Sequence, residues 1–221
     1  MAQAPRTAGS SASLSDDPIE SFTNWLQMNS KPIAMVLGGA AIAAAAIFVY
    51  RSTTASTREK ASAALYTAQQ PFVEGKFTEA ESALSKVVDR FGSTASGQQA
   101  VLMLAQVQYE QKKYDDGIKG LEKALGSASA DFKPSINAMI ASGYELKGDF
   151  AKAAEAYGKA ADATSFPTEK QTFQASQARS LMAAGKGAEA KTIWEALAQL
   201  EGSQAQQEAQ VRLGELAGKQ P

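Results

Sequence analysis

The chain of 221 residues is long enough for one or two domains, and its formal net charge is −1 at pH 7. It contains no cysteine and no histidine, which excludes disulfides, thiol nucleophiles and the commonest general base and metal ligand of proteins. The nearly balanced charge gives no electrostatic basis for nucleic-acid binding. We therefore expect a protein that is not an enzyme, with no catalytic residue, no metal site and no cofactor.

Residues 16–31 have the features of a short amphipathic helix. Ile19, Phe22 and Trp25 fall on one face at helical spacing. This pattern predicts a helix on a membrane surface, with Trp25 at the headgroups. The alternative is an unstructured leader whose apolar spacing arises by chance. Residues 1–15 are rich in small and polar side chains, and we expect them to be disordered.

A membrane-spanning signal anchor is predicted for residues 32–51. Residues 33–50 read IAMVLGGAAIAAAAIFVY and contain no charged side chain. As a helix they would extend about 27 Å, close to the thickness of a bilayer core. Lys31 and Arg51 bracket the run, and Tyr50 has the position typical of interfacial aromatic residues. The alternatives are a buried helix, for which the chain offers no surrounding elements, and a cleaved signal peptide, which the long acidic leader disfavours.

Small residues lie along one face of the predicted anchor. Gly39 and Ala43, or Ala40 and Ala44, are one helical turn apart. Such pairs permit close approach of two helices in lipid, so these four residues are candidates for membrane helix packing. The alternative is that alanine is present simply as a good helix former.

Positive charges near the anchor conflict with export of the large C-terminal part. The amino-terminal side carries Lys31 and the distant Arg6, whereas the carboxyl-terminal side carries Arg51, Arg58 and Lys60. Taken from these counts alone, the positive-inside rule places the C-terminal part in the cytoplasm. A long domain of balanced charge can still be translocated, because the rule applies to short loops.

A short pattern recurs four times in the rest of the chain, as GKFTEA, KKYDDG, GDFAKA and GKGAEA. Each copy has a turn-like pair, an aromatic slot and a small residue three places later. The slots are 37, 36 and 37 residues apart, and they hold Phe77, Tyr114, Phe150 and Gly187. Apolar residues continue on one helical face after each slot, and another helical stretch with a small residue precedes it. A period of this size predicts stacked helix hairpins.

The predicted fold class is all-α: a single N-terminal transmembrane helix followed by a right-handed α-solenoid of about four helix hairpins. The repeat domain is assigned to residues 57–218. Its hairpins are assigned to residues 58–91, 98–126, 134–162 and 169–200, and a capping helix to 204–218. Ala209, Leu213 and Leu216 are expected to cover the open end, and Pro71 predicts a kinked or shortened helix in the first hairpin. The alternative is an unrelated helical bundle.

These units resemble the tetratricopeptide repeat. In that motif small residues, a glycine-aromatic turn and a second-helix aromatic or leucine recur. The third unit matches most fully, at Ala141, Tyr144, Gly148, Phe150, Ala153, Tyr157 and Ala160. Pro71 and Gly187 depart from the motif in the first and fourth units. The resemblance implies a scaffold that binds partner chains on a concave face formed mainly by the first helices.

Helical periodicity assigns candidate groove residues to that face. They are Gln69, Phe72, Gln106, Tyr109, Ser142, Glu145, Arg179 and Met182. The set is apolar and amide-rich with little net charge, so the predicted ligand is an apolar or extended polypeptide. Packing between repeats is the alternative for part of the set, and it is the better interpretation for Leu65 and Leu102, which fall on the same face.

The order of leader, anchor and repeats, together with EAKTIWEAL at 189–197, resembles the YfgM-type ancillary subunits of the bacterial SecYEG translocon. The resemblance implies an inner-membrane protein with a cytoplasmic N-terminus and a periplasmic repeat domain. It also implies partnership with translocon subunits, exported chains and periplasmic chaperones. The alternative is an accessory structural subunit of another inner-membrane complex. A carboxylate enzyme using Asp115, Asp116 or Glu145 is disfavoured, because the two aspartates lie where helix-starting residues are expected.

Overall fold

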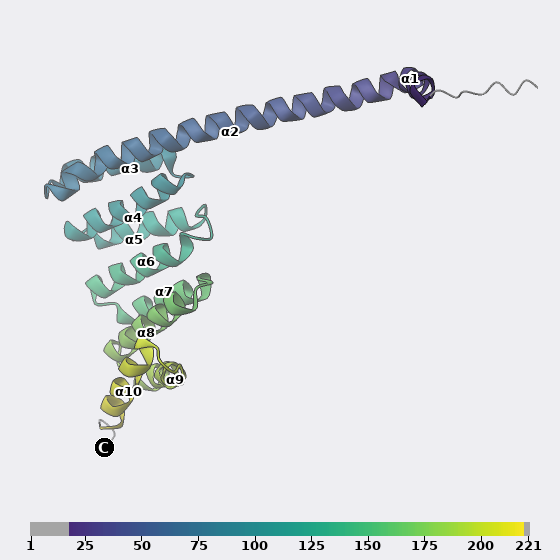
Figure 1. Ribbon diagram of the computed structural model, residues 1–221. Helices are drawn as coiled ribbons and strands as arrows, with labels where there is room; N and C mark the ends of the chain where they lie inside the picture. Colours follow the sequence, from purple (N-terminus) through teal and green to yellow (C-terminus); the bar gives the residue numbers. More distant parts are fainter. Residues whose placement is uncertain (1–17, 219–221) are drawn as a thin grey trace, which may run out of the picture. The chain divides into compact units, whose positions relative to one another are not determined.

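The computed structural model describes residues 18–218 of a chain that divides into two compact units, residues 1–54 and 55–221. The predicted disordered leader, 1–15, lies outside the described residues, as do the first two residues of the predicted amphipathic helix. The described part contains ten helices and no strand, which confirms the all-α class (Figure 1). The helices are α1 (Pro18–Met28), α2 (Ser30–Val73), α3 (Phe77–Phe91), α4 (Ala95–Glu110), α5 (Tyr114–Leu125), α6 (Lys133–Lys147), α7 (Phe150–Ala163), α8 (Pro167–Ala183), α9 (Gly187–Ala198) and α10 (Gln204–Ala217).

The described part of the N-terminal unit consists of α1 and the first part of α2. Ile19, Phe22 and Trp25 of α1 are exposed, and the rings of Phe22 and Trp25 stack with their centroids 6.2 Å apart. In α2 nearly every side chain of the charge-free run 33–50 is exposed. The run is long and apolar enough to cross a membrane, although a signal sequence meets the same criteria.

Each recurring turn joins the two helices of a hairpin in the second unit. The second helices α3, α5, α7 and α9 begin at the four residues of the aromatic slot. The turn residue two places earlier has a left-handed backbone in every case, with φ of 74° at Gly75, 60° at Lys112, 78° at Gly148 and 76° at Gly185. Glycine adopts this conformation readily, whereas a residue with a Cβ pays about 1–2 kcal/mol. Lys112 is therefore a strained position in the second turn.

Small residues allow the paired helices to approach closely. The residues three places after the slot are all buried: Ala80, Gly117, Ala153 and Ala190. The small residues of the first helices are buried as well: Ala68, Ala105, Ala141 and Ala178. Three apolar clusters form around these contacts, with Leu84, Leu121 and Trp194 fully buried in the first, second and third. From α3 to α10 each helix packs against the next, which produces the α-solenoid (Figure 1).

The two departures from the repeat motif have different outcomes. Pro71 lies inside α2, which continues to Val73, so the first helix of this hairpin is not shortened at the proline. At the fourth slot, a Cβ on Gly187 would lie 3.4 Å from Leu216 Cδ2. Leu213 and Leu216 pack against the third cluster. A leucine from α10 thus occupies the space beside this turn that an aromatic ring fills in the other units.

Candidate protein-binding surface

Tyr109, one of the predicted groove residues, is buried at 7% exposure on α4. Its hydroxyl donates a hydrogen bond to the backbone oxygen of Met139 at 3.0 Å. A Cβ at Gly117 would lie 2.4 Å from the Tyr109 ring, and one at Gly143 would lie 2.3 Å from its hydroxyl. Burial raises the pKa of Tyr109 above its ordinary value. Tyr109 therefore connects the second hairpin to the third and offers little surface to a ligand.

Gln69 and Phe72, on the second part of α2, are half-buried. The Gln69 Nε2 donates to Met103 Sδ of α4 at 3.3 Å. The Phe72 ring packs against the Phe77 ring, with centroids 6.1 Å apart. Both side chains therefore take part in contacts within and between the first two hairpins.

Glu145 lies at the centre of a polar contact between the third and fourth hairpins. Its carboxylate accepts hydrogen bonds from Ser180 Oγ at 2.7 Å and from Tyr157 Oη at 3.0 Å. Ser180 is almost fully buried. Burial, with the nearby Glu145 carboxylate, raises the pKa of Tyr157. Hydrogen bonds to a carboxylate are stronger than neutral ones, so Glu145 fixes the relation between α6 and α8.

Arg179 and Met182 contact the end of the stack. The Arg179 guanidinium donates to both carboxylate oxygens of Glu208 on α10, at 2.9 and 3.0 Å. The Trp194 Nε1 donates to Met182 Sδ at 3.3 Å. Six of the eight predicted groove residues are thus engaged in contacts of the stack itself.

Gln106 and Ser142 differ from the other six. Within the described residues, neither side chain makes a hydrogen bond. Gln106 is exposed and Ser142 is half-buried. Gln106 is therefore the predicted groove residue most available to a partner.

Three exposed apolar residues on the first helices of the hairpins were missed by the sequence analysis: Tyr66 and Val73 on α2 and Leu146 on α6, at 69%, 80% and 51% exposure. Val73 and Leu146 each follow directly after a predicted groove residue. The signal was present in the repeat, because Val73 and Leu146 occupy equivalent positions in the first and third units. We call Tyr66, Val73, Gln106 and Leu146 the exposed first-helix band. Its chemistry suits burial of apolar side chains and hydrogen bonding to a partner backbone.

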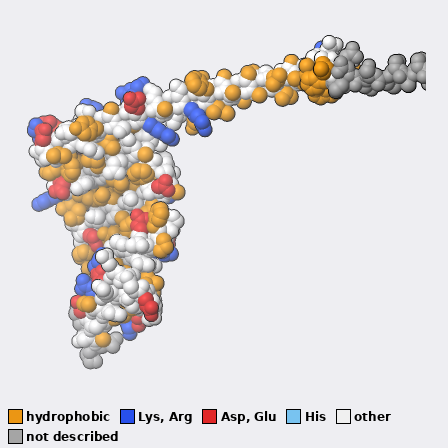
Figure 2. Space-filling view, viewed as in Figure 1, with side chains coloured by type: hydrophobic (Ala, Val, Ile, Leu, Met, Phe, Trp, Pro, Cys, Tyr) orange, Lys and Arg blue, Asp and Glu red, His pale blue; other side chains and the backbone are white. Residues whose placement is uncertain are grey.

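The described surface mixes charged and apolar side chains. Basic and acidic side chains are interspersed with apolar ones in the view of Figure 2. No group of three metal-ligating side chains occurs among the described residues. Asp115 and Asp116 lie in the first turn of α5, and Asp115 forms an ion pair with Lys147.

The candidate membrane packing residues Gly39, Ala40, Ala43 and Ala44 are exposed on α2. A Cβ at Gly39 would meet no atom within 4 Å. The helix therefore has an open face of small residues here, and its packing against a second membrane helix remains a prediction.

Stacked helix hairpins with left-handed turns define a helical-repeat scaffold. Residues 23–218 match the model of the tetratricopeptide repeat-like domain, and the chain belongs to this family. Proteins of this family generally act as non-enzymatic scaffolds for protein–protein interaction. A comparison with curated proteins found no match.

Solved structures of similar fold come from distant proteins. The TPR-like repeats of a protein described as a kinesin light chain from Podosopora anserina are 17% identical, with a TM-score of 0.56 over 73% of this chain and 87% of that one. A tetratricopeptide repeat protein from Parabacteroides merdae is 15% identical, with a TM-score of 0.56 over 72% and 61%. BtubC from P. vanneervenii is 12% identical, with a TM-score of 0.53 over 73% and 66%. At these identities the likeness shows the fold alone.

Proposed function

We propose that this protein is a membrane-anchored scaffold of the bacterial inner membrane whose periplasmic repeat domain binds polypeptide partners. In this proposal it is ancillary to the Sec translocon and assists exported proteins. One observation carries the proposal. The same chain contains an exposed, charge-free helical run, 33–50, and a tetratricopeptide repeat-like domain.

The anchor is supported by the exposure of its apolar side chains. Met35, Ile42 and Phe48 are each more than 70% exposed, and side chains of this kind are stable in lipid rather than in water. The stacked Phe22 and Trp25 of α1 suit the headgroup region, where aromatic side chains concentrate. In this proposal Gly39 and Ala43 pack against a membrane helix of the partner complex.

The partner-binding surface is the exposed first-helix band. Large apolar side chains exposed at equivalent repeat positions cost free energy in water, and a partner chain would remove them from it. Gln106 adds an amide that can donate to and accept from a peptide backbone. The candidate groove residues Phe72 and Ser142 would contribute their exposed parts to the same surface.

Labelling of single cysteines tests the membrane orientation, since the chain has no cysteine of its own. Ser93 is exposed in the turn between α3 and α4, so Ser93→Cys should react with a membrane-impermeant maleimide in cells with only the outer membrane opened. Ser10→Cys, on the amino-terminal side of the anchor, should react only after lysis. The reverse pattern would place the repeats in the cytoplasm, as the local Lys and Arg count implies, and would exclude a role with exported chains.

The second candidate is an accessory structural subunit of another inner-membrane complex. It is favoured by the engagement of six of the eight groove residues in contacts of the stack, because a rigid stack suits a brace. A photoreactive residue at Ala43 separates the two functions. Adducts with translocon subunits support the first, and adducts with one different membrane complex support the second.

A further inference from the structure

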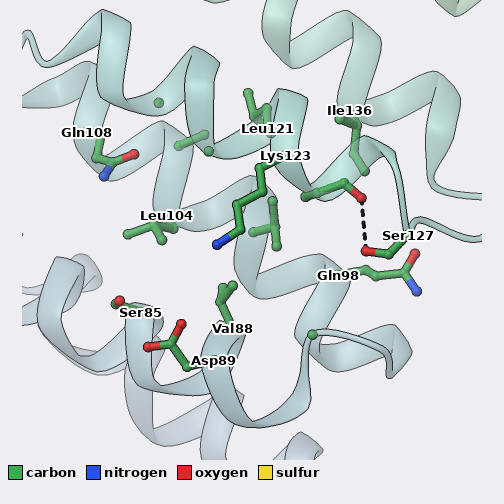
Figure 3. Close-up of a pocket in the computed structure, with 16 residues that line it drawn as sticks. Ser85, Val88, Asp89, Gln98, Leu104, Gln108, Leu121, Lys123, Ser127 and Ile136 are labelled. Atoms are coloured by element: carbon green, nitrogen blue, oxygen red, sulfur yellow. Dashed lines mark hydrogen bonds between the residues drawn. The ribbon is translucent and has the colours of Figure 1, made fainter.

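A pocket of about 390 Å³ lies outside the exposed first-helix band, between the second helices of the first two hairpins. Its walls are α3 and α5, and its floor is α4 (Figure 3). The apolar lining includes Val88, Val101, Leu104, Leu121 and Ala124. The volume lies within the range of about 300–1,000 Å³ typical of ligand pockets. None of the eight predicted groove residues lines it.

Gly120 is an exposed residue on the lining of this pocket. A Cβ built on it would meet no atom within 4 Å. The equivalent residue of the third hairpin is Ala156, which lines a smaller pocket of about 130 Å³ between α5, α6 and α7. In the first and fourth hairpins the same position holds Ala83 and Ile193. Glycine in a helix interior is destabilising by about 1 kcal/mol relative to alanine. Helix stability therefore does not explain why position 120 is a glycine.

Opposite charges face the pocket from its two walls. Asp89 and Ser85 line it from α3, and Lys123 extends toward them from α5 (Figure 3). Within the described part of the chain, none of these three side chains has a hydrogen bond or ion pair. The other polar lining groups are occupied: Gln98 Oε1 accepts from Ser129, and Gln108 Nε2 donates to Glu81.

An apolar floor between a carboxylate and an ammonium group fits an occupant with an apolar centre flanked by both signs of charge. A short amphipathic helix supplies this, because residues three and four places apart share a face. A large apolar side chain would fill the space that Gly120 leaves, a basic residue would pair with Asp89, and an acidic residue would pair with Lys123.

We propose that the pocket between α3 and α5 is a second protein-binding site, which takes an amphipathic helix of a partner through one large apolar anchor flanked by a basic and an acidic residue. This site lies outside the exposed first-helix band. The proposal holds whichever side of the membrane the repeat domain occupies.

The test is a selection of random displayed peptides on the full-length chain in detergent micelles, with counter-selection on Gly120→Leu. The leucine enters open space at the lining of the pocket, where its side chain should reduce the volume open to a partner. Gly214→Leu is the matched control, because Gly214 is also helical, its Cβ would also meet nothing within 4 Å, and it lies on α10. Circular dichroism checks that each variant is folded. Gly120→Ala replaces the leucine variant if that one fails to fold.

We expect the enriched peptides to share a large apolar residue flanked by a basic and an acidic one. Their Kd should rise at least about tenfold on Gly120→Leu, which is ~1.4 kcal/mol, and should stay unchanged on Gly214→Leu. Lys123→Glu should weaken the binding of those peptides that need their acidic residue to bind. Peptides that bind both glycine variants equally would overturn the proposal, as would a selection that yields none dependent on Gly120. A lipid or small organic molecule retained by the natural chain and lost from Gly120→Leu in native mass spectrometry would overturn it as well.

Discussion

Gly117→Ala and Gly120→Ala, three residues apart on α5, should have different effects on stability. Each substitution gains about 0.8–1 kcal/mol of helix propensity. At Gly120 the new methyl group meets no atom within 4 Å, so the gain should be realised. At Gly117 it would lie 2.4 Å from Tyr109 Cε1. The Tyr109 ring is held by its hydrogen bond to Met139, so it cannot move away freely.

Overpacking of this kind typically costs about 1–3 kcal/mol. We therefore expect Gly117→Ala to be less stable than Gly120→Ala by about 1–3 kcal/mol, and the natural chain to lie between the two or close to Gly117→Ala. The measurement is urea unfolding of the full chain in micelles, followed by circular dichroism. In a Tyr109→Leu background the Gly117→Ala penalty should largely disappear, which a double-mutant cycle detects. Equal stability of the two alanine variants, or a penalty that persists without the ring, would refute the account of Tyr109 packing.

Three further predictions concern the turns, the cap and pH. Lys112→Gly should raise stability by about 1 kcal/mol in urea unfolding, because it relieves the left-handed backbone at φ 60°, while Lys113→Gly, with φ −86°, should not. Leu216→Ala should lower stability by roughly 1–2 kcal/mol and shift Trp194 fluorescence to the red, because it uncovers the third cluster. The Lys113 ammonium lowers the pKa of the Glu81 carboxyl below its ordinary 4.5. The ionised Glu81 therefore contributes to stability above that pH, and this contribution is lost as the pH falls and the carboxyl is protonated. The melting temperature of Glu81→Gln should therefore fall less steeply on acidification than that of the natural chain.

The hairpins could be predicted from the sequence because their signals are local. A turn residue and an aromatic slot recur at a fixed spacing, and each second helix begins at the slot residue. The chain offered a second signal that was not used. Gly117 stands where the other units have alanine, and Gly143 lies in the middle of α6. Both glycines make room for Tyr109.

The partner-facing surface was harder to predict, because it depends on how neighbouring hairpins meet. Tyr109 and Glu145 share a helical face with exposed residues, and the packing of the next hairpin decides which of them is covered. The exposed neighbours Val73 and Leu146 differ from predicted groove residues by a single position. The role of Leu216 at the fourth slot depends on a contact with a helix almost thirty residues away. The pocket at Gly120 likewise depends on the separation of α3 and α5, which no local pattern encodes.

Photocrosslinking from the exposed first-helix band tests most directly whether this protein is a polypeptide-binding scaffold. A photoreactive residue at Gln106 would be irradiated in living cells, with Thr192, exposed on the second helix α9, as the control position. We expect adducts with exported chains or periplasmic chaperones from Gln106 and few or none from Thr192. Equal yields from both positions, or no polypeptide adduct from Gln106, would contradict the account.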